Sequence, residues 1–171
     1  MSESLAGISR DELILTNSKE TFKSNDSRFR NNEKILKVAA VDIGTNSTHL
    51  AIASVDPSLH TFSIDFAEKS STRLGNRDVE TGNLTNLAKD KVIETLKRFK
   101  DIAISHKVQE IILAATSAVR EAPNGKEFLN QIKSDLELEV ELVSGIEEAR
   151  LIYLGVLSGM PFGNSPHFVL D

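Results

Sequence analysis

The chain has 171 residues, of which 40% are apolar and 26% charged, a composition typical of one soluble globular domain with a real core. It contains no cysteine and four histidines, which excludes a disulfide framework and a cysteine-based zinc site and favours oxygen ligands for any metal ion. The formal net charge of −5 argues against a nucleic-acid scaffold, because such binding usually depends on a basic excess.

The first 34 residues differ in character from the rest of the chain. They contain neither a basic leader nor a long apolar run, so we expect no signal peptide, no membrane span and a cytoplasmic protein. A weak capping pattern at 9–12 predicts a short helix over the apolar residues that follow. Residues 16–34 are almost entirely polar and cannot offset their ordering entropy by burial. We therefore expect residues 1–34 to be a mobile extension and the folded body to begin at Ile35.

The folded body opens with three predicted strands. Apolar or alternating runs cover 35–43, 50–55 and 61–68, and turns rich in glycine, asparagine, serine and proline separate them. Connections this short predict a three-stranded antiparallel meander.

The hydrophobic period then changes to that of a helix. Apolar residues recur at helical spacing from Ala88 to Ala103, with Thr85 as a plausible N-cap. A buried-looking strand at 111–115, a turn at 116–121 and a helix at 125–136 follow. A strand at 138–143, a helix at 144–157 and the start of a last strand at 168–170 complete the pattern. The order βββαβαβα over 35–157 predicts an α/β fold: a mixed five-stranded sheet covered by helices.

A candidate phosphate-binding turn follows the first strand. Asp42 stands at the strand end, and Gly44-Thr45-Asn46-Ser47 comes directly after it. Successive backbone N–H groups and short polar side chains in such a turn can form a nest for phosphate oxygens, while the carboxylate holds magnesium or its water shell. The alternative is an ordinary hairpin turn whose residues only satisfy local geometry. Neither a Walker nor a Rossmann glycine pattern occurs.

A second candidate lies at the start of the helix predicted over 144–157. Ser144 and Glu147 form a capping box, which gives Glu147 a structural explanation. Glu148 has none, and Leu151 and Ile152 lie three and four residues further on, so its side of the helix is apolar. The alternative is a surface glutamate stabilised by the helix dipole.

Four motifs taken together resemble the Ppx/GppA phosphatases (exopolyphosphatases and guanosine pentaphosphate phosphohydrolases) of the actin, sugar-kinase and Hsp70 superfamily. They are DIGTNSTHL at 42–50, RLG at 73–75, ATSAVREAPN at 115–124 and SGIEEARLIYLGV at 144–156. The likeness covers about residues 38–171. It implies a ribonuclease-H-like fold and a phosphoanhydride hydrolase that uses magnesium and acts on polyphosphate or guanosine pentaphosphate, with a homodimer as one state of the full-length protein.

The resemblance also implies a role for individual residues. It assigns phosphate binding to Gly44, Thr45, Asn46, Ser47 and Arg120, metal binding to Asp42 and Asp171, and the role of catalytic base to Glu148. Family members continue past the last strand into a second phosphate loop, and this chain stops at the first acid of that loop. We therefore expect residues 35–171 to be an N-terminal subdomain that is inactive or nearly so by itself.

Two other functions stay open from the sequence. A kinase or ATPase of the same superfamily would share the Asp-x-Gly turn and bind ATP. A sensor module would bind polyphosphate or guanosine pentaphosphate without cleaving it.

Overall fold

The computed structural model describes residues 35–59 and 61–159, which fall within one compact unit of the chain. The predicted mobile extension, the short helix near the N-terminus, the strand at 168–170 and Asp171 lie outside the described residues.

A five-stranded mixed sheet forms the centre of the fold. Its strands are β1 (Leu36–Ile43), β2 (Thr48–Asp56), β3 (Thr61–Ser70), β4 (Glu110–Ala115) and β5 (Val140–Leu142). The order across the sheet is β3-β2-β1-β4-β5. The β1–β2 and β2–β3 pairs are antiparallel, as hairpin connections require, whereas β1–β4 and β4–β5 are parallel and are joined by helical crossovers.

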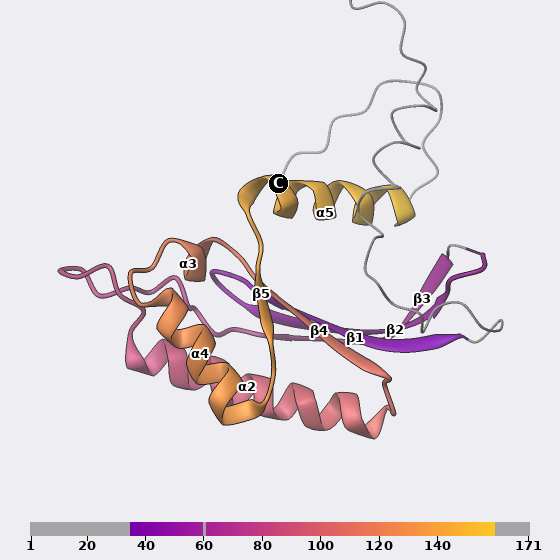
Figure 1. The fold of residues 1–171 in the computed structure, drawn as a ribbon, viewed down its shortest axis with the longest axis horizontal. Coiled ribbons are helices and arrows are strands. Elements are labelled where there is room, and N and C mark those ends of the chain that lie inside the picture. The colour runs from indigo at the N-terminus through magenta and orange to yellow at the C-terminus, as the bar shows by residue number, and fades with distance from the viewer. Residues whose placement is uncertain (1–34, 60, 160–171) are drawn as a thin grey trace, which may run out of the picture. The chain divides into compact units, whose positions relative to one another are not determined.

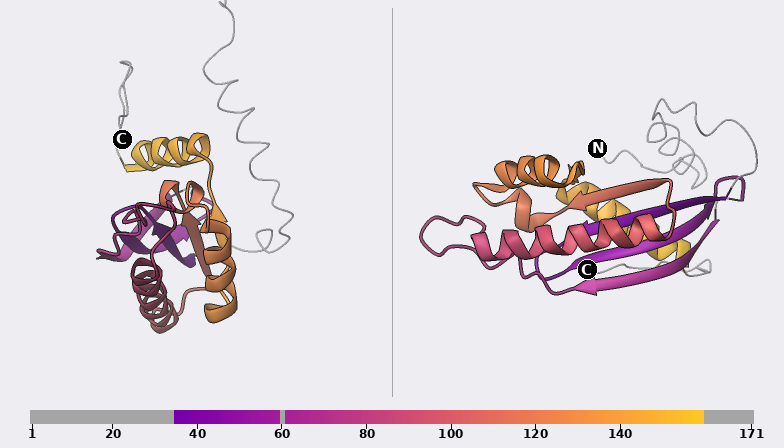
Figure 2. Two further views of the ribbon diagram at one scale, coloured as in Figure 1. Left: turned by 90° about the vertical axis from the view of Figure 1, so that its left-hand side faces the viewer. Right: turned by 90° about the horizontal axis from the view of Figure 1, so that it is seen from below.

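The helices lie on both sides of this sheet. α2 (Asn86–Ser105) and α4 (Gly125–Leu136) cover one face, and α5 (Gly145–Gly159) runs along the other (Figures 1 and 2). The short helix α3 (Ser117–Arg120) follows β4 directly. None of the described helices combines the length and the apolar character needed to cross a membrane.

The core lies between the sheet and α2 with α4. On β1 the buried residues are Ala39, Val41 and Ile43, alternating with exposed ones because successive side chains point to opposite faces. The buried stripe of α2 includes Leu96 and Phe99. Thr85 caps this helix by accepting a hydrogen bond from the Ala88 N–H at 3.3 Å, so the predicted cap is confirmed.

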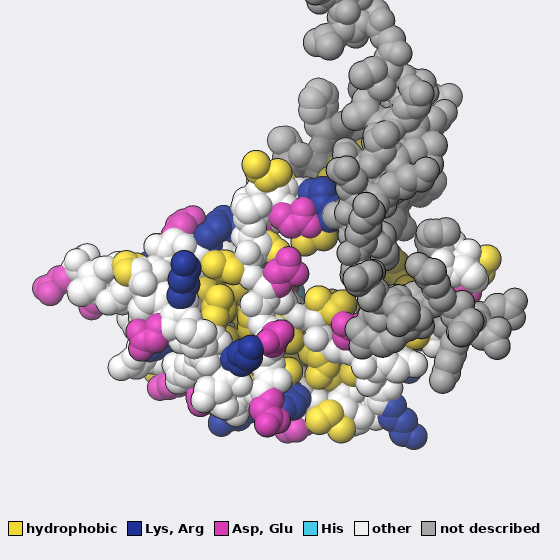
Figure 3. Space-filling view, in the orientation of Figure 1, with side chains coloured by type: hydrophobic (Ala, Val, Ile, Leu, Met, Phe, Trp, Pro, Cys, Tyr) yellow, Lys and Arg dark blue, Asp and Glu magenta, His cyan; other side chains and the backbone are white. Residues whose placement is uncertain are grey.

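The face toward α5 is more open and carries small side chains. Ala40, Ala51 and Ala67 are neighbours across β1, β2 and β3 in the strand register. They line a cavity of about 550 Å³, and Leu151 of α5 lines it from the helix side. In Figure 3, hydrophobic side chains reach the surface below α5. α5 therefore packs loosely on the described part of this face.

The predicted element order and the mixed five-stranded sheet are confirmed. Two details of the prediction were wrong. The strand predicted at 138–143 is shorter and covers Val140–Leu142. The turn predicted at 116–121 contains one helical turn, α3, whose Arg120 and Glu121 N–H groups find carbonyl partners at Thr116 and Ser117.

Candidate functional site

Sheet topology brings three connections to one edge of the molecule. β1, β4 and β5 are mutually parallel, so their carboxyl ends lie at the same edge of the sheet. These ends lead into the loop of residues 44–47, into α3 and into α5, respectively. The carboxyl ends of parallel strands are where α/β proteins place their ligands. The candidate residues that follow these strands are therefore neighbours in space although they are far apart in sequence.

The loop of residues 44–47 is a tight turn between β1 and β2. The Gly44 N–H donates to the Ser47 carbonyl at 3.1 Å. A Cβ at position 44 would lie 3.0 Å from that same carbonyl oxygen and 3.8 Å from a carboxylate oxygen of Asp42. A side chain at this position would crowd the turn, which favours glycine here.

The backbone of residues 73–75 donates hydrogen bonds to the carbonyl groups of this loop. The Arg73 N–H donates to the Asn46 carbonyl at 2.9 Å, and the Gly75 N–H donates to the Thr45 carbonyl at 2.8 Å. Among the described residues, nothing accepts a hydrogen bond from the N–H groups of Thr45, Asn46 and Ser47. A loop whose carbonyls are engaged and whose successive N–H groups are free has the character of an anion-binding nest.

Buried contacts fix the supporting segment in turn. The Thr48 and Thr72 hydroxyls share a buried hydrogen bond of 3.1 Å, and Leu74 is completely buried. Arg73, between them, has a φ of 51°, a left-handed conformation that a non-glycine residue adopts at a cost. Such strain persists only where surrounding contacts enforce it, and here they align two N–H groups with the loop.

Helix α3 connects the loop to the second half of the site. The Thr45 hydroxyl lies 3.0 Å from the hydroxyl of Ser117, the first residue of α3. Arg77 holds α3 from outside, since its guanidinium donates to the Ala118 carbonyl at 3.2 Å and to Glu121 at 3.3 Å. The helix is therefore anchored to the loop at one end.

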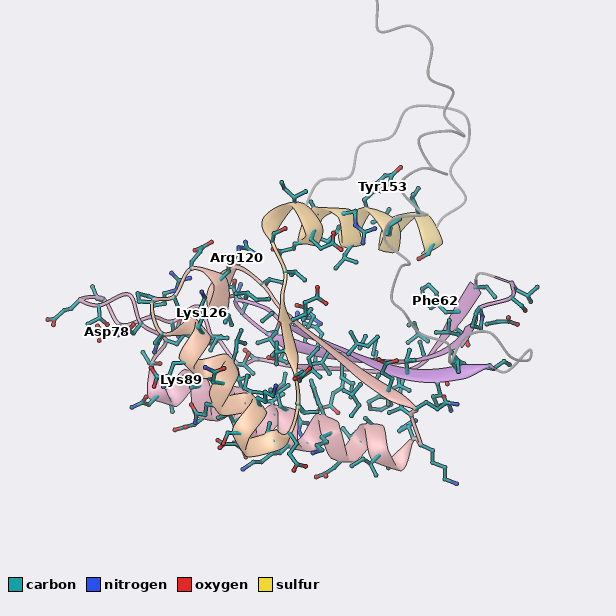
Figure 4. The ribbon with its side chains drawn as sticks, viewed as in Figure 1. Phe62, Asp78, Lys89, Arg120, Lys126 and Tyr153 are labelled. Atoms are coloured by element: carbon teal, nitrogen blue, oxygen red, sulfur yellow. The ribbon has the colours of Figure 1, made fainter. Side chains whose placement is uncertain are left out.

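Arg120, at the other end of α3, reaches α5. Its guanidinium donates to the Val143 carbonyl at 2.8 Å and to the Glu148 carboxylate at 3.2 Å. Both side chains of this ion pair are less than one-third exposed, with 29% for Arg120 and 28% for Glu148. Figure 4 shows Arg120 beside the segment that rises from β5 to α5. The pair fixes the direction of the Glu148 carboxylate relative to the sheet edge.

Glu147 and Glu148 have different ion-pair partners. The Glu147 N–H donates to the Ser144 hydroxyl at 3.2 Å, which is half of the predicted capping box. The other half is absent among the described residues, because the Glu147 carboxylate binds Arg150 at 2.7 and 2.8 Å instead. Glu147 thus faces a partner on its own helix, whereas Glu148 faces Arg120 and the sheet.

Asp42 lies close enough to Glu148 for the two charges to interact. The residue as a whole is exposed, yet atoms packed around its carboxyl exclude water and raise its pKa above the ordinary value of 3.8. Nearby His49 lowers this pKa, and nearby Glu148 raises it. A bound cation would stabilise the ionised form of a carboxylate that is partly dehydrated and has a second carboxylate nearby.

The residues present fit a magnesium ion that is held by one protein carboxylate together with the phosphates of a bound substrate. Within 35–59 and 61–159, no three acidic or histidine side chains gather in a metal-binding arrangement. Magnesium is usually bound through one or two carboxylates together with substrate phosphates and water. Asp42 can supply one carboxylate, and Asp171, the other predicted ligand, is outside the described residues.

The structure brings most predicted site residues to one edge, namely the loop 44–47, Asp42, Arg120 and Glu148. Sequence reasoning missed the contribution of Arg73 and Gly75. The RLG motif at 73–75 stands out only through the family resemblance, and no local pattern shows that its N–H groups meet the loop. Ser117 follows a buried strand, a position that parallel topology makes a candidate.

Gly75→Ala tests the support behind the loop. A Cβ at this position would lie 2.4 Å from the Thr45 Cγ2 atom and 3.3 Å from the Thr45 carbonyl oxygen. We expect a loss of about 1–3 kcal/mol in the free energy of unfolding, measured by urea denaturation, because the segment must move or strain. Gly155→Ala is the matched control, since nothing lies within 4 Å of the added Cβ. It should leave stability unchanged or raise it, and equal effects of the two variants would contradict the account.

Asp42→Asn tests the electrostatics of the site. Because the folded-state pKa of Asp42 is raised, its ionised form is disfavoured in the folded protein, so stability is lost as pH rises through that pKa. The variant should therefore unfold at a higher temperature than the parent at neutral pH, and the difference should vanish below about pH 3.8. Asp78→Asn should do the opposite at neutral pH, since hydrogen bonds from Thr81 lower the pKa of Asp78. Destabilisation by Asp42→Asn at neutral pH would contradict this.

Comparison with known proteins identifies the family. A sequence model of the Ppx/GppA phosphatase family matches residues 51–171, a range that includes Arg120 and Glu148 and begins just after the loop of residues 44–47. Exopolyphosphatase 1 of Mycobacterium tuberculosis is 31% identical over 121 residues, covering 71% of this chain and 35% of that protein. A bifunctional 3-dehydroquinate synthase/phosphatase of Fusobacterium nucleatum is 28% identical over 125 residues, covering 70% of this chain and 19% of that protein.

Solved structures agree with the sequence match. The Ppx/GppA enzyme of Aquifex aeolicus superposes with a TM-score of 0.69 and 35% identity, covering 76% of this chain and 43% of that one. An exopolyphosphatase from Cytophaga hutchinsonii gives a TM-score of 0.64 and 34% identity, covering 70% of this chain and 38% of that one. The chain thus spans less than half the length of these relatives. Its sheet, its helices and the ordered motifs on them show that it belongs to the Ppx/GppA phosphatase family.

Proposed function

We propose that the full-length protein is a phosphoanhydride hydrolase that releases orthophosphate from the end of inorganic polyphosphate. One observation carries the proposal: the N–H groups of residues 45–47, which meet no acceptor among the described residues, and the carboxylate of Glu148 belong to connections at one sheet edge, linked through α3. The exopolyphosphatases among its relatives support this substrate class. Guanosine pentaphosphate ends in the same kind of bond, and the same site would accept it.

The roles follow from what each group can do. The N–H groups and hydroxyls of the loop would hold the terminal phosphoryl oxygens, where negative charge must be stabilised during transfer. Glu148 would take a proton from the water that attacks this phosphorus, as the anhydride P–O bond breaks and the shortened chain leaves. Arg120 orients that carboxylate through the 3.2 Å ion pair, and its remaining N–H groups would be available to a phosphate oxygen.

Magnesium would be held by Asp42 together with phosphate oxygens, and when bound it neutralises charge on the phosphates. Burial raises the pKa of Asp42, and a bound cation would favour its ionised form. The predicted cytoplasmic location, the homodimer and the inactivity of the 171-residue chain by itself stay predictions.

Orthophosphate release discriminates this function from its rivals. The full-length protein is incubated with polyphosphate and with guanosine pentaphosphate, with and without magnesium. Release that depends on magnesium supports the hydrolase. Binding without release would favour a sensor module, and tight ATP binding without release from either substrate would favour a kinase or ATPase.

Glu148→Gln tests the catalytic assignment in the full-length protein. Glutamine keeps the size of the side chain and removes the base, so we expect the kcat for orthophosphate release to fall by about 100-fold or more. KM should change little, because the loop that binds the phosphoryl group is untouched.

Glu147→Gln is the matched control for that experiment. It makes the same chemical change one residue earlier, on a side chain that binds Arg150 instead of facing the sheet. Its kcat should stay near that of the parent. Normal turnover by Glu148→Gln, or equal losses in both variants, would remove Glu148 from the proposed role.

A further inference from the structure

A histidine that the proposed mechanism does not use touches the phosphate loop. The His49 Nε2 atom lies 2.7 Å from the Ser47 hydroxyl oxygen, a short hydrogen bond between the last loop residue and the second residue of β2. In the strand register His49 lies between Asp42 of β1 and Lys69 of β3. All three residues are exposed and line the cavity on the α5 side of the sheet. His49 is therefore not a core residue held by packing.

The direction of this hydrogen bond decides what Ser47 can offer a ligand. A serine hydroxyl has one proton and two lone pairs. If it donates to Nε2, its proton is used, and its oxygen presents lone pairs to an incoming phosphate. If Nε2 carries the proton and donates, the serine proton is free to point at the phosphate. Only the second arrangement adds a favourable hydrogen bond to an anion.

A bound phosphate would favour the second arrangement. An imidazolium and one neutral tautomer both have a proton on Nε2, so donation to Ser47 does not depend on full protonation of the ring. A phosphate at the free N–H groups of residues 45–47 would itself select the arrangement in which protons face it.

We propose that His49 is a positioning residue: its Nε2–H donates to the Ser47 oxygen and so directs the Ser47 hydroxyl proton toward a bound phosphoryl group. This inference rests on the proposed function, since it assumes that the loop binds phosphate. His49 acts through Ser47, and no contact of its own with the substrate is required.

Tripolyphosphate binding and orthophosphate release by the full-length protein test this role. His49→Leu removes the donor and should weaken tripolyphosphate binding and raise KM by about 10-fold, the value of one hydrogen bond to a charged group. The kcat should change less than KM, because Glu148 and Arg120 are untouched. His49→Gln restores an N–H donor on a side chain of similar reach and should recover most of the loss, which a role in packing alone would not explain.

A double-mutant cycle with Ser47→Ala separates the inference from the function on which it rests. In the Ser47→Ala background, His49→Leu should have no further effect, because the hydroxyl that it orients is gone. His106→Leu is the matched control. That ring lies at the end of α2 against Phe66, 5.2 Å between centroids, and its loss should leave binding unchanged.

Each outcome has a definite consequence. If Ser47→Ala weakens binding and His49→Leu does not, or if His49→Gln fails to recover binding, the role of His49 is overturned and the hydrolase proposal stands. If tripolyphosphate binds and responds to both variants but no orthophosphate is released, the hydrolase proposal fails and His49 keeps its positioning role. If neither variant affects binding, the loop is not the phosphate site and both are overturned.

Discussion

Two backbone hydrogen bonds support the rest of the candidate site, from the Arg73 and Gly75 N–H groups to the carbonyls of Asn46 and Thr45. A turn rich in small polar residues can point its N–H groups in many directions. Here its carbonyls are engaged by the neighbouring backbone, and nothing in the described part of the chain accepts from the N–H groups of Thr45, Asn46 and Ser47. The buried Leu74 and the strained φ of Arg73 show that the surrounding fold enforces this arrangement.

Sheet topology then brings an acid and a cationic side chain to the edge where the loop lies. Parallel pairing of β1 with β4 and of β4 with β5 makes α3 and α5 begin at the sheet edge where the loop lies. Ser117 and Arg120, three residues apart on one short helix, link Thr45 to Glu148. A change in the order of these strands would separate the donors from the acid, even if every local motif survived.

Local patterns in the sequence predicted most of the fold, because hydrophobic periodicity and capping residues are local properties. Thr85 and the apolar stripe from Ala88 to Ala103 predicted α2 almost to its ends. Glu148 was distinguished from Glu147 by its position on the helix, and the Arg150 pairing of Glu147 agrees with that distinction. The support from Arg73 and Gly75 could not be predicted in this way, since it depends on a left-handed residue and on contacts about 27 to 30 residues apart in sequence, which no local propensity encodes.

Amide chemical shifts test the central claim most directly. Tripolyphosphate and magnesium are titrated into the isotopically labelled 171-residue chain, and the backbone N–H resonances are followed. Free donors held ready for an anion predict that the largest shifts fall on Thr45, Asn46 and Ser47, with smaller ones at Arg73 and Gly75 behind them. Shifts confined to other parts of the chain, with these five resonances unmoved at saturation, would contradict the account.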